Sequence, residues 1–180
     1  GFDHLEGSNL NDTLTINNNT TSLIKTIKGM AGNDKLISAG IGLNTSNINN
    51  ELYGNMGNDQ LISAGNDFVV TTMHGGKGKD EFYLLHGKEN IIELAHSNIG
   101  NANKVFGYDK TKATIKLIND STTENFTMED LSAYKNVHTV TFAAPTNANY
   151  VLNLQKTNYS TSGGTITETP TTNTFTVNGT

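Results

Sequence analysis

Six aspartates in the first half of the chain recur in a context that suits metal binding. Each has an apolar residue two places further on: Asp3/Leu5, Asp12/Leu14, Asp34/Leu36, Asp59/Leu61, Asp67/Val69 and Asp80/Phe82. The later aspartates, Asp109, Asp120 and Asp130, are followed there by Thr, Thr and Ser. With 34% of residues hydrophobic, six matches from six would arise by chance roughly once in a thousand. Carboxylate oxygens are ligands for hard cations such as Ca²⁺, so the spacing indicates a series of metal sites.

Four of these aspartates close a longer block that opens with glycine. The blocks read Gly7-Ser-Asn-Leu-Asn-Asp12, Gly29-Met-Ala-Gly-Asn-Asp34, Gly54-Asn-Met-Gly-Asn-Asp59 and Gly75-Gly-Lys-Gly-Lys-Asp80. Glycine stands at position 1 in all of them and at position 4 in three, and aspartate stands at position 6 throughout. A single Gly-Asn-Asp stretch is an ordinary β-turn former. Four blocks in phase, each with an apolar residue two places after the aspartate, favour repeated metal-binding turns.

The resulting pattern, G-x-x-G-x-D-x-U-x with U apolar, resembles the nonapeptide of the RTX (repeats-in-toxin) family. The resemblance covers the part of the chain before residue 96, and the block from Gly75 to Tyr83 matches at all nine positions. It implies an all-β fold: a parallel β-roll with calcium ions in its turns, followed by a β-rich C-terminal cap.

The resemblance also implies a ligand set, made of the carbonyl oxygens at positions 1 and 3 and the carboxylate at position 6. In this chain those residues are Gly7, Asn9, Asp12, Gly29, Ala31, Asp34, Gly54, Met56, Asp59, Gly75, Lys77 and Asp80. Four stacked turns leave three gaps, so about three calcium ions are expected along this row of turns.

The elements that position these residues are glycine turns, each followed by a short strand such as residues 34–37 or 59–62. Nine residues make half a turn of such a roll, so successive aspartates should alternate between two edges. One edge is predicted to hold Asp12, Asp34, Asp59 and Asp80. The other is predicted to hold Asp3, Thr21, Asn50, Asp67 and Glu89, the last with Ile91 in the core. Of these, Asp67 is the expected further calcium ligand, and residues 39–49 are expected to form a surface loop.

Beyond the repeats, the pattern divides the chain into a calcium-binding roll at 1–98 and a β-rich C-terminal cap at 99–180. Strand-like runs occur at 113–118, 137–143, 150–154, 164–167 and 174–177. Thr127-Met-Glu-Asp130 resembles a capping box that would open a short helix. In RTX proteins exported by type I secretion, such a cap follows the roll and leads to an uncleaved secretion signal.

Composition narrows the functional classes. The chain of 180 residues contains no cysteine, so a thin core cannot be supplemented by disulfides and a metal is the next candidate. The net charge is −5, and all 12 basic residues are scattered lysines, which argues against a nucleic-acid partner. No apolar run is long enough to span a membrane. No N-terminal signal peptide is evident either, which suggests an excised fragment or a C-terminal piece.

Catalysis within the chain is not expected. The five histidines form no His-Glu-x-x-His motif, and no Gly-x-Ser-x-Gly motif occurs. We therefore expect a calcium-dependent structural module of an exported bacterial surface protein, of the S-layer or adhesin type and from a Gram-negative bacterium. Its expected partners are calcium, the type I secretion machinery and further copies in a surface lattice. The alternative is the calcium-folding secretion tail of a secreted enzyme or toxin, such as a metalloprotease, lipase or cytolysin.

Overall fold

The computed structural model describes residues 3–17, 25–39, 48–95, 103–118, 125–128, 134–143, 149–154, 158–162, 165–169 and 173–178. These residues contain strands and connecting turns but no helix. The first strands are β1 (His4–Glu6), β2 (Thr13–Ile16), β3 (Thr26–Ala31), β4 (Lys35–Ser38), β5 (Ile48–Met56), β6 (Gln60–Ala64), β7 (Val69–Lys77), β8 (Glu81–His86), β9 (Glu89–Ala95) and β10 (Lys104–Ile118). They are followed by β11 (Asn125–Met128), β12 (Tyr134–Ala143), β13 (Asn149–Leu154), β14 (Asn158–Ser162), β15 (Thr165–Thr169) and β16 (Asn173–Asn178).

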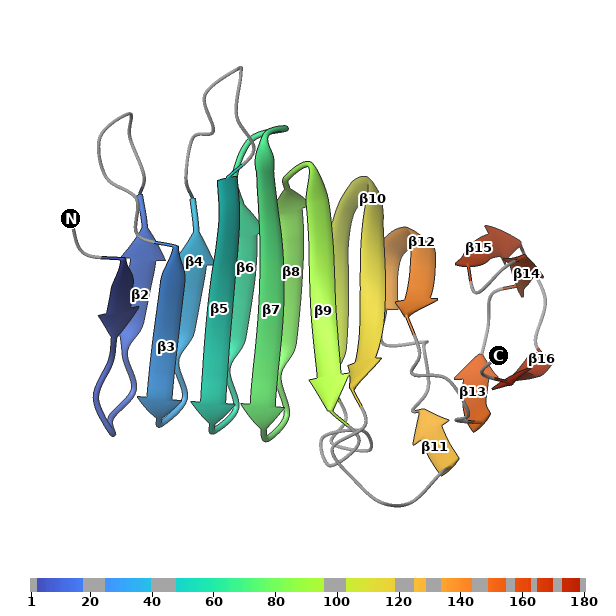
Figure 1. Cartoon of the computed structure of the whole chain (residues 1–180), viewed down its shortest axis with the longest axis horizontal. Coiled ribbons are helices and arrows are strands. Elements are labelled where there is room, and N and C mark those ends of the chain that lie inside the picture. Colours follow the sequence, from blue (N-terminus) through green and yellow to red (C-terminus); the bar gives the residue numbers. More distant parts are fainter. Residues whose placement is uncertain are drawn as a thin grey trace.

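Strands β1 to β10 wind into a parallel β-solenoid with two faces (Figure 1). Odd-numbered strands β1 to β9 pair side by side on one face, and even-numbered strands β2 to β8 pair on the other. The long strand β10 continues both faces, because residues 104–107 pair with β8 and residues 113–118 pair with β9. The prediction of an all-β, parallel roll-like fold is confirmed.

The core of the solenoid is one thin layer of apolar side chains between the two faces. The apolar residues two places after the aspartates supply one half of it: Leu14, Leu36, Leu61 and Phe82 are in register, followed by Val105. The other half is formed by Leu5, Ile27, Leu52, Met73, Ile92 and Ile115, also in register. Alternate residues of a strand point to opposite sides, so the repeat of aspartate and apolar residue places both kinds of side chain inside the roll.

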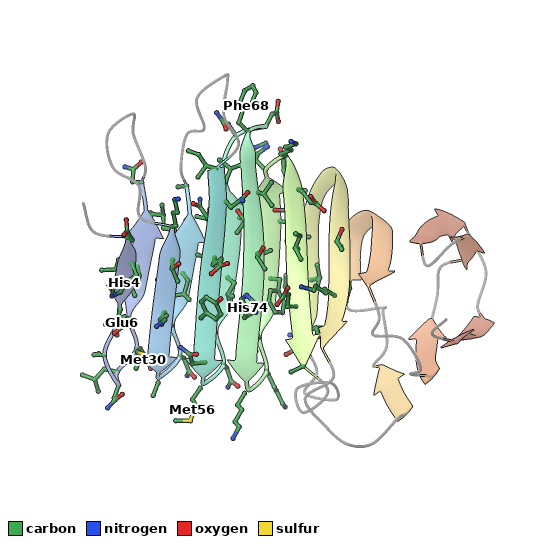
Figure 2. All side chains as sticks on the ribbon, in the orientation of Figure 1. His4, Glu6, Met30, Met56, Phe68 and His74 are labelled. Carbon is green, nitrogen blue, oxygen red and sulfur yellow. The ribbon has the colours of Figure 1, made fainter. Side chains whose placement is uncertain are left out.

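The outer surface of the odd-numbered face carries a row of paired polar side chains (Figure 2). Glu6 forms an ion pair with Lys28 at 3.0 Å. Further along the row Tyr53 stacks on His74 with ring centroids 4.2 Å apart, and His74 Nδ1 lies 3.3 Å from Glu93. The same carboxylate binds Lys116 at 2.7 Å. His74 thus contributes to packing and pairing on the sheet surface.

The C-terminal strands extend this architecture. Strand β12 pairs with β10 in parallel, β15 pairs with β12 in the antiparallel sense, and β14 pairs with β15. Strands β11, β13 and β16 form a separate three-stranded sheet. The strand-like runs after residue 112 coincide with β10, β12, β13, β15 and β16. Parallel stacking continues past the boundary predicted at residue 98. Thr127 lies in β11, and residues 129–133, where the predicted helix would begin, are outside the described part of the chain.

Candidate metal centre

The four glycine–aspartate blocks lie on one edge of the solenoid, which we call the turn edge (residues 7–12, 29–34, 54–59 and 75–80). Each block links an odd-numbered strand to the next even-numbered strand. The side chains of Met30 and Met56 mark this edge in Figure 2, whereas Phe68 marks the opposite edge. The prediction that Asp12, Asp34, Asp59 and Asp80 share an edge is confirmed, because hydrogen bonds connect them in succession.

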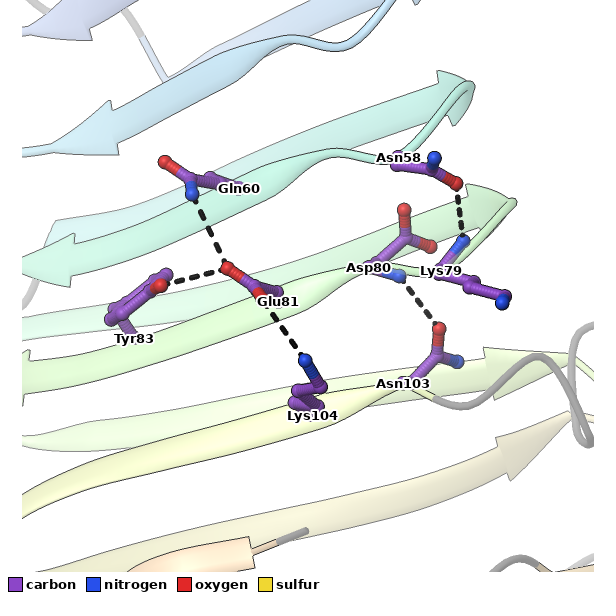
Figure 3. Close-up of polar contacts among 8 residues, drawn as sticks. All are labelled: Asn58, Gln60, Lys79, Asp80, Glu81, Tyr83, Asn103 and Lys104. Atoms are coloured by element: carbon purple, nitrogen blue, oxygen red, sulfur yellow. Dashed lines mark hydrogen bonds and ion pairs between the residues drawn. The ribbon is translucent and has the colours of Figure 1, made fainter.

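One oxygen of each aspartate joins neighbouring turns. The backbone N–H of Asp12 donates to Asp34 Oδ1 at 2.8 Å, and that of Asp34 donates to Asp59 Oδ1 at 2.8 Å. The N–H of Asp59 donates to Asp80 Oδ1 at 3.0 Å, and that of Asp80 donates to Asn103 Oδ1 at 2.9 Å (Figure 3). The carboxylates are therefore held in a column along the edge, with one oxygen each already used.

A second column runs beside the first and in the opposite sense. Asn33 N–H donates to Asn11 Oδ1 and Asn58 N–H to Asn33 Oδ1, both at 2.8 Å. Lys79 N–H donates to Asn58 Oδ1 at 2.9 Å (Figure 3). These asparagines occupy position 5 of their blocks, which the sequence pattern left open. Their recurrence at position 5 was the available signal, and the structure shows that they fix each turn to the next.

The second carboxylate oxygen of three aspartates is buried and has no hydrogen-bond partner among the described residues: Asp34 Oδ2, Asp59 Oδ2 and Asp80 Oδ2. The three residues are 2%, 1% and 0% exposed. Burial raises the pKa of Asp59 and of Asp80 to about 6, and it raises the pKa of Asp34 as well. An unpaired buried carboxylate is costly unless a cation or a proton neutralises it. Each of these oxygens is thus a candidate ligand.

The glycines at position 1 leave the carboxylates next to main-chain oxygens. A methyl group added at Gly29 would lie 2.9 Å from the Gly54 carbonyl oxygen and closer still to Asp34 Oδ2. At Gly54 an added methyl group would overlap both Asp59 Oδ2 and the Gly75 carbonyl oxygen. The absence of a Cβ therefore lets a carboxylate oxygen and the carbonyl of the next turn approach the same point. Such clustering of hard oxygens, one of them anionic, fits the coordination preference of Ca²⁺.

The position 3 carbonyl oxygens of two blocks already accept one hydrogen bond each. Met56 O accepts the N–H of Gly32 at 3.0 Å, and Lys77 O accepts the N–H of Gly57 at 2.9 Å. A carbonyl oxygen has two lone pairs, so each keeps one for a further donor or a metal. The position 3 side chains of Met56 and Lys77 are exposed, so only their main chain can contribute to a site inside the turns.

The opposite edge differs from the prediction in register. Thr71, not Asp67, is aligned with Asn50, and Asn90, not Glu89, is aligned with Thr71. Asp67 is exposed in the turn that precedes β7. The residue aligned between Asp3 and Asn50 is Lys25, whose N–H donates to the Asp3 carbonyl. Thr21, predicted there, is outside the described residues.

The aligned residues on the opposite edge make a neutral polar cluster. Asn50 Nδ2 donates to Ser38 Oγ at 2.8 Å, and Ser38 Oγ lies 3.1 Å from Thr71 Oγ1. Asn50 Oδ1 and Asn90 Oδ1 are buried without a partner among the described residues. Amide and hydroxyl oxygens carry no charge to offset the desolvation of a divalent ion. Among the described residues, buried unpaired carboxylate oxygens lie on the turn edge, whereas the buried unpaired oxygens of Asn50 and Asn90 are uncharged.

Asn103 is a residue of the candidate site that the sequence pattern missed. It lies at the end of the aspartate column, and Val105, two places later, is fully buried in the core (Figure 3). Asn103 thus accepts the Asp80 N–H as each position 6 aspartate accepts the N–H of the preceding one. The signal was present in its spacing from Val105, but a search restricted to aspartate passes over it.

Comparison with protein-family models, with curated proteins and with solved structures found no match for this chain. Within the described residues, no three His, Asp or Glu side chains gather into a metal-binding cluster. A site on the turn edge would instead combine one or two carboxylates with main-chain carbonyls. The described part of the chain also has no helix of the length and hydrophobicity needed to cross a membrane.

Proposed function

We propose that the turn edge binds calcium through the carboxylates of Asp34, Asp59 and Asp80. The observation that carries this proposal is the column of three buried Oδ2 atoms without hydrogen-bond partners among the described residues. Neighbouring turns are about one strand spacing apart, roughly 4.8 Å. An ion between two turns would reach oxygens of both. Three unpaired carboxylate oxygens support about three ions, one beside each of Asp34, Asp59 and Asp80.

Main-chain oxygens complete the proposed ligand set. The position 1 carbonyls of Gly54 and Gly75 face the preceding glycine and its aspartate, as the space around Gly29 and Gly54 shows. The position 3 carbonyls of Met56 and Lys77 each retain a lone pair. Calcium takes six to eight oxygen ligands with flexible geometry, so carbonyls and waters can fill the shell around a small number of carboxylates.

Calcium binding would then control folding. The core is one layer thick, and three buried carboxylates oppose folding while they are unpaired. A bound cation removes that penalty, so the binding free energy contributes directly to the folded state. Extracellular calcium modules work at roughly 10⁻⁴–10⁻³ M, well above cytoplasmic calcium levels. Such a chain stays unfolded before export and folds outside the cell.

The biological role we propose is a calcium-dependent structural module of an exported bacterial surface protein, S-layer or adhesin in type, exported by type I secretion. The acidic, cysteine-free composition rich in asparagine and threonine supports it. Surface assemblies built with this chain should dissolve in chelator, and lattices that stay intact would count against the role. The alternative, a secretion tail of an enzyme or toxin, predicts a catalytic motif such as His-Glu-x-x-His upstream in the parent protein.

The metal proposal is tested by calcium titration of the chelator-treated chain, followed by far-UV circular dichroism and calorimetry. We expect a coil-to-β transition with about three ions bound, and a weaker transition in Asp59→Asn. Magnesium at the same concentration is the control, because its small octahedral shell suits a carbonyl-rich site poorly. A chain that is fully β-folded in chelator and binds no calcium would show that the blocks are ordinary turns.

A further inference from the structure

The first turn of the turn edge, residues 7–12, differs in backbone conformation from the three that follow. In the later turns, positions 2 and 4 both have positive φ: Met30 (85°) and Gly32 (115°), Asn55 (73°) and Gly57 (134°), Gly76 (96°) and Gly78 (138°). Ser8 and Leu10 occupy these positions in the first turn, and neither has a positive φ. At position 1 the first block resembles the others, because a Cβ added at Gly7 would lie 2.6 Å from the Gly29 carbonyl oxygen and 2.7 Å from Asp12 Oδ2. It differs from them in backbone conformation at positions 2 and 4.

The carboxylate of the first turn is also satisfied within the turn. Asp12 Oδ2 accepts the backbone N–H of Ser8 at 2.6 Å and the Ser8 hydroxyl at 2.8 Å. Ser8 Oγ in turn accepts the N–H of Leu10 at 3.1 Å. These hydrogen bonds from Ser8 lower the pKa of Asp12, whereas burial raises the pKa of Asp34. The oxygen that remains unpaired in the later turns is thus occupied by protein donors in the first.

Position 4 shows why glycine recurs in the later turns and is absent from the first. A Cβ added at Gly32 would lie 2.6–2.7 Å from the carbonyl group of Leu10 in the preceding turn. At Gly57 and Gly78 an added Cβ would overlap the carbonyl oxygen of the preceding position 4 residue. Position 4 therefore needs glycine whenever a turn lies on its N-terminal side. Leu10 occupies position 4 in the first turn, where its side chain is 74% exposed.

We infer that residues 7–12 form a metal-free turn beside the calcium-binding turns, and we call this turn the cap. Ser8 defines the cap, because its N–H and its hydroxyl both donate to the Asp12 carboxylate. This inference rests on the proposed calcium binding, and it assigns the ions to Asp34, Asp59 and Asp80.

The test counts calcium ions by native mass spectrometry on the full chain and on two isosteric variants. Asp12→Asn should bind as many ions as the unaltered chain, because the first turn holds none. Asp59→Asn is the matched change in an ion-binding turn, and it should lose at least one ion. Loss of an ion in Asp12→Asn, to the same extent as in Asp59→Asn, overturns the cap assignment.

The unaltered chain provides a second measurement that does not depend on the folding of a variant. Anomalous scattering from calcium in crystals should place ions beside Asp34, Asp59 and Asp80 and none within ligand distance of Asp12. An ion on Asp12 Oδ2 would refute the cap. A chain that binds no calcium at all would instead refute the proposed function, so the two failures are distinguishable.

Discussion

At the scale of single residues, the turn edge is defined by carboxylates that are buried without neutralising partners. Asp59 and Asp80 each use one oxygen to hold the preceding turn and leave the other unpaired among the described residues. The hydrogen bond to one oxygen fixes the orientation of the carboxylate. The other oxygen is unpaired, so binding of a cation to it is favourable. One aspartate therefore serves both the spacing of the turns and the proposed metal site.

These carboxylates predict an unusual pH dependence without calcium. Burial raises the pKa of Asp59 and Asp80 to about 6, whereas an unfolded aspartate titrates near ~3.9. Between these two pKa values the folded state binds more protons than the unfolded state. Protonation of Asp59 and Asp80 therefore stabilises the fold fully below about pH 4, and this stabilisation is lost as pH rises through about 6. In chelator, far-UV circular dichroism should show more β-structure at pH 4.5 than at pH 7.5.

Two control experiments test this predicted pH dependence. Saturating calcium should restore β-structure at pH 7.5, because the ion neutralises the same carboxylates. The double variant Asp59→Asn/Asp80→Asn should lose most of the pH dependence in chelator. A folded fraction that rises with pH in calcium-free solution would contradict the buried, unpaired state of these groups.

Position 4 glycine allows a second prediction at this scale. Gly57 has φ of 134°, and a Cβ there would overlap the Gly32 carbonyl oxygen. Gly57→Ala should therefore lower the free energy of unfolding in calcium by about 2 kcal/mol or more. Leu10→Ala changes the same repeat position in the first turn, where the side chain is exposed, and should stay within about 0.5 kcal/mol. Denaturant unfolding in saturating calcium compares the two, and equal effects would refute the stacking argument.

At the scale of elements, the register of β7 decides the chemistry of the opposite edge. Pairing with β5 aligns Thr71 with Asn50 and leaves Asp67 exposed before the strand. Thr71 Oγ1 lies 3.1 Å from Ser38 Oγ across the core. The strand thus brings a hydroxyl, not a carboxylate, into the interior.

This register predicts that a substitution at Thr71 lowers stability, whereas a substitution at Asp67 has little effect. Thr71→Ala removes a buried hydrogen-bond partner of Ser38 and should cost about 1–3 kcal/mol. Asp67→Asn changes an exposed turn residue and should alter stability by less than about 0.5 kcal/mol. Unfolding and calcium titration of both variants test the assignment. A reduced calcium count in Asp67→Asn would show that the opposite edge binds an ion after all.

At the scale of the whole molecule, the stack is a one-dimensional array in which each strand pair depends on its neighbours. Hydrogen bonds between turns couple Asp12 through Asn103 in one continuous column. Strand β12 covers the C-terminal side by pairing with β10 from Val105 to Lys116. Without β12, the backbone of β10 would be an exposed sheet edge, which promotes association with other chains.

Truncation tests this dependence. A chain of residues 1–169 keeps β12 and the strand β15 that pairs with it, and should retain the calcium-dependent transition as a monomer in size-exclusion chromatography. A chain of residues 1–118 lacks β12 and should need more calcium to fold and should self-associate. If both chains fold at the same calcium concentration and remain monomeric, β12 is dispensable as a cover.

The sequence by itself determined the turn edge and the fold class. Each block is contiguous, so its glycines, its aspartate and the apolar residue two places later specify a turn and a strand without reference to distant residues. Leu36, Leu61 and Phe82 are fully buried, as their positions after the aspartates predicted.

Only the tertiary structure decided which residues fill the opposite edge and which oxygens remain unpaired. Strand register depends on insertions of unequal length between the blocks and on packing against the neighbouring strand, and a shift by one residue exchanges the two faces. Ile91 was predicted in the core, yet Ile92 is the buried residue. Likewise the Ser8 hydroxyl pairs with Asp12, whereas Asp34 Oδ2 has no partner among the described residues. That difference depends on backbone conformation and burial, which the shared aspartate pattern does not encode.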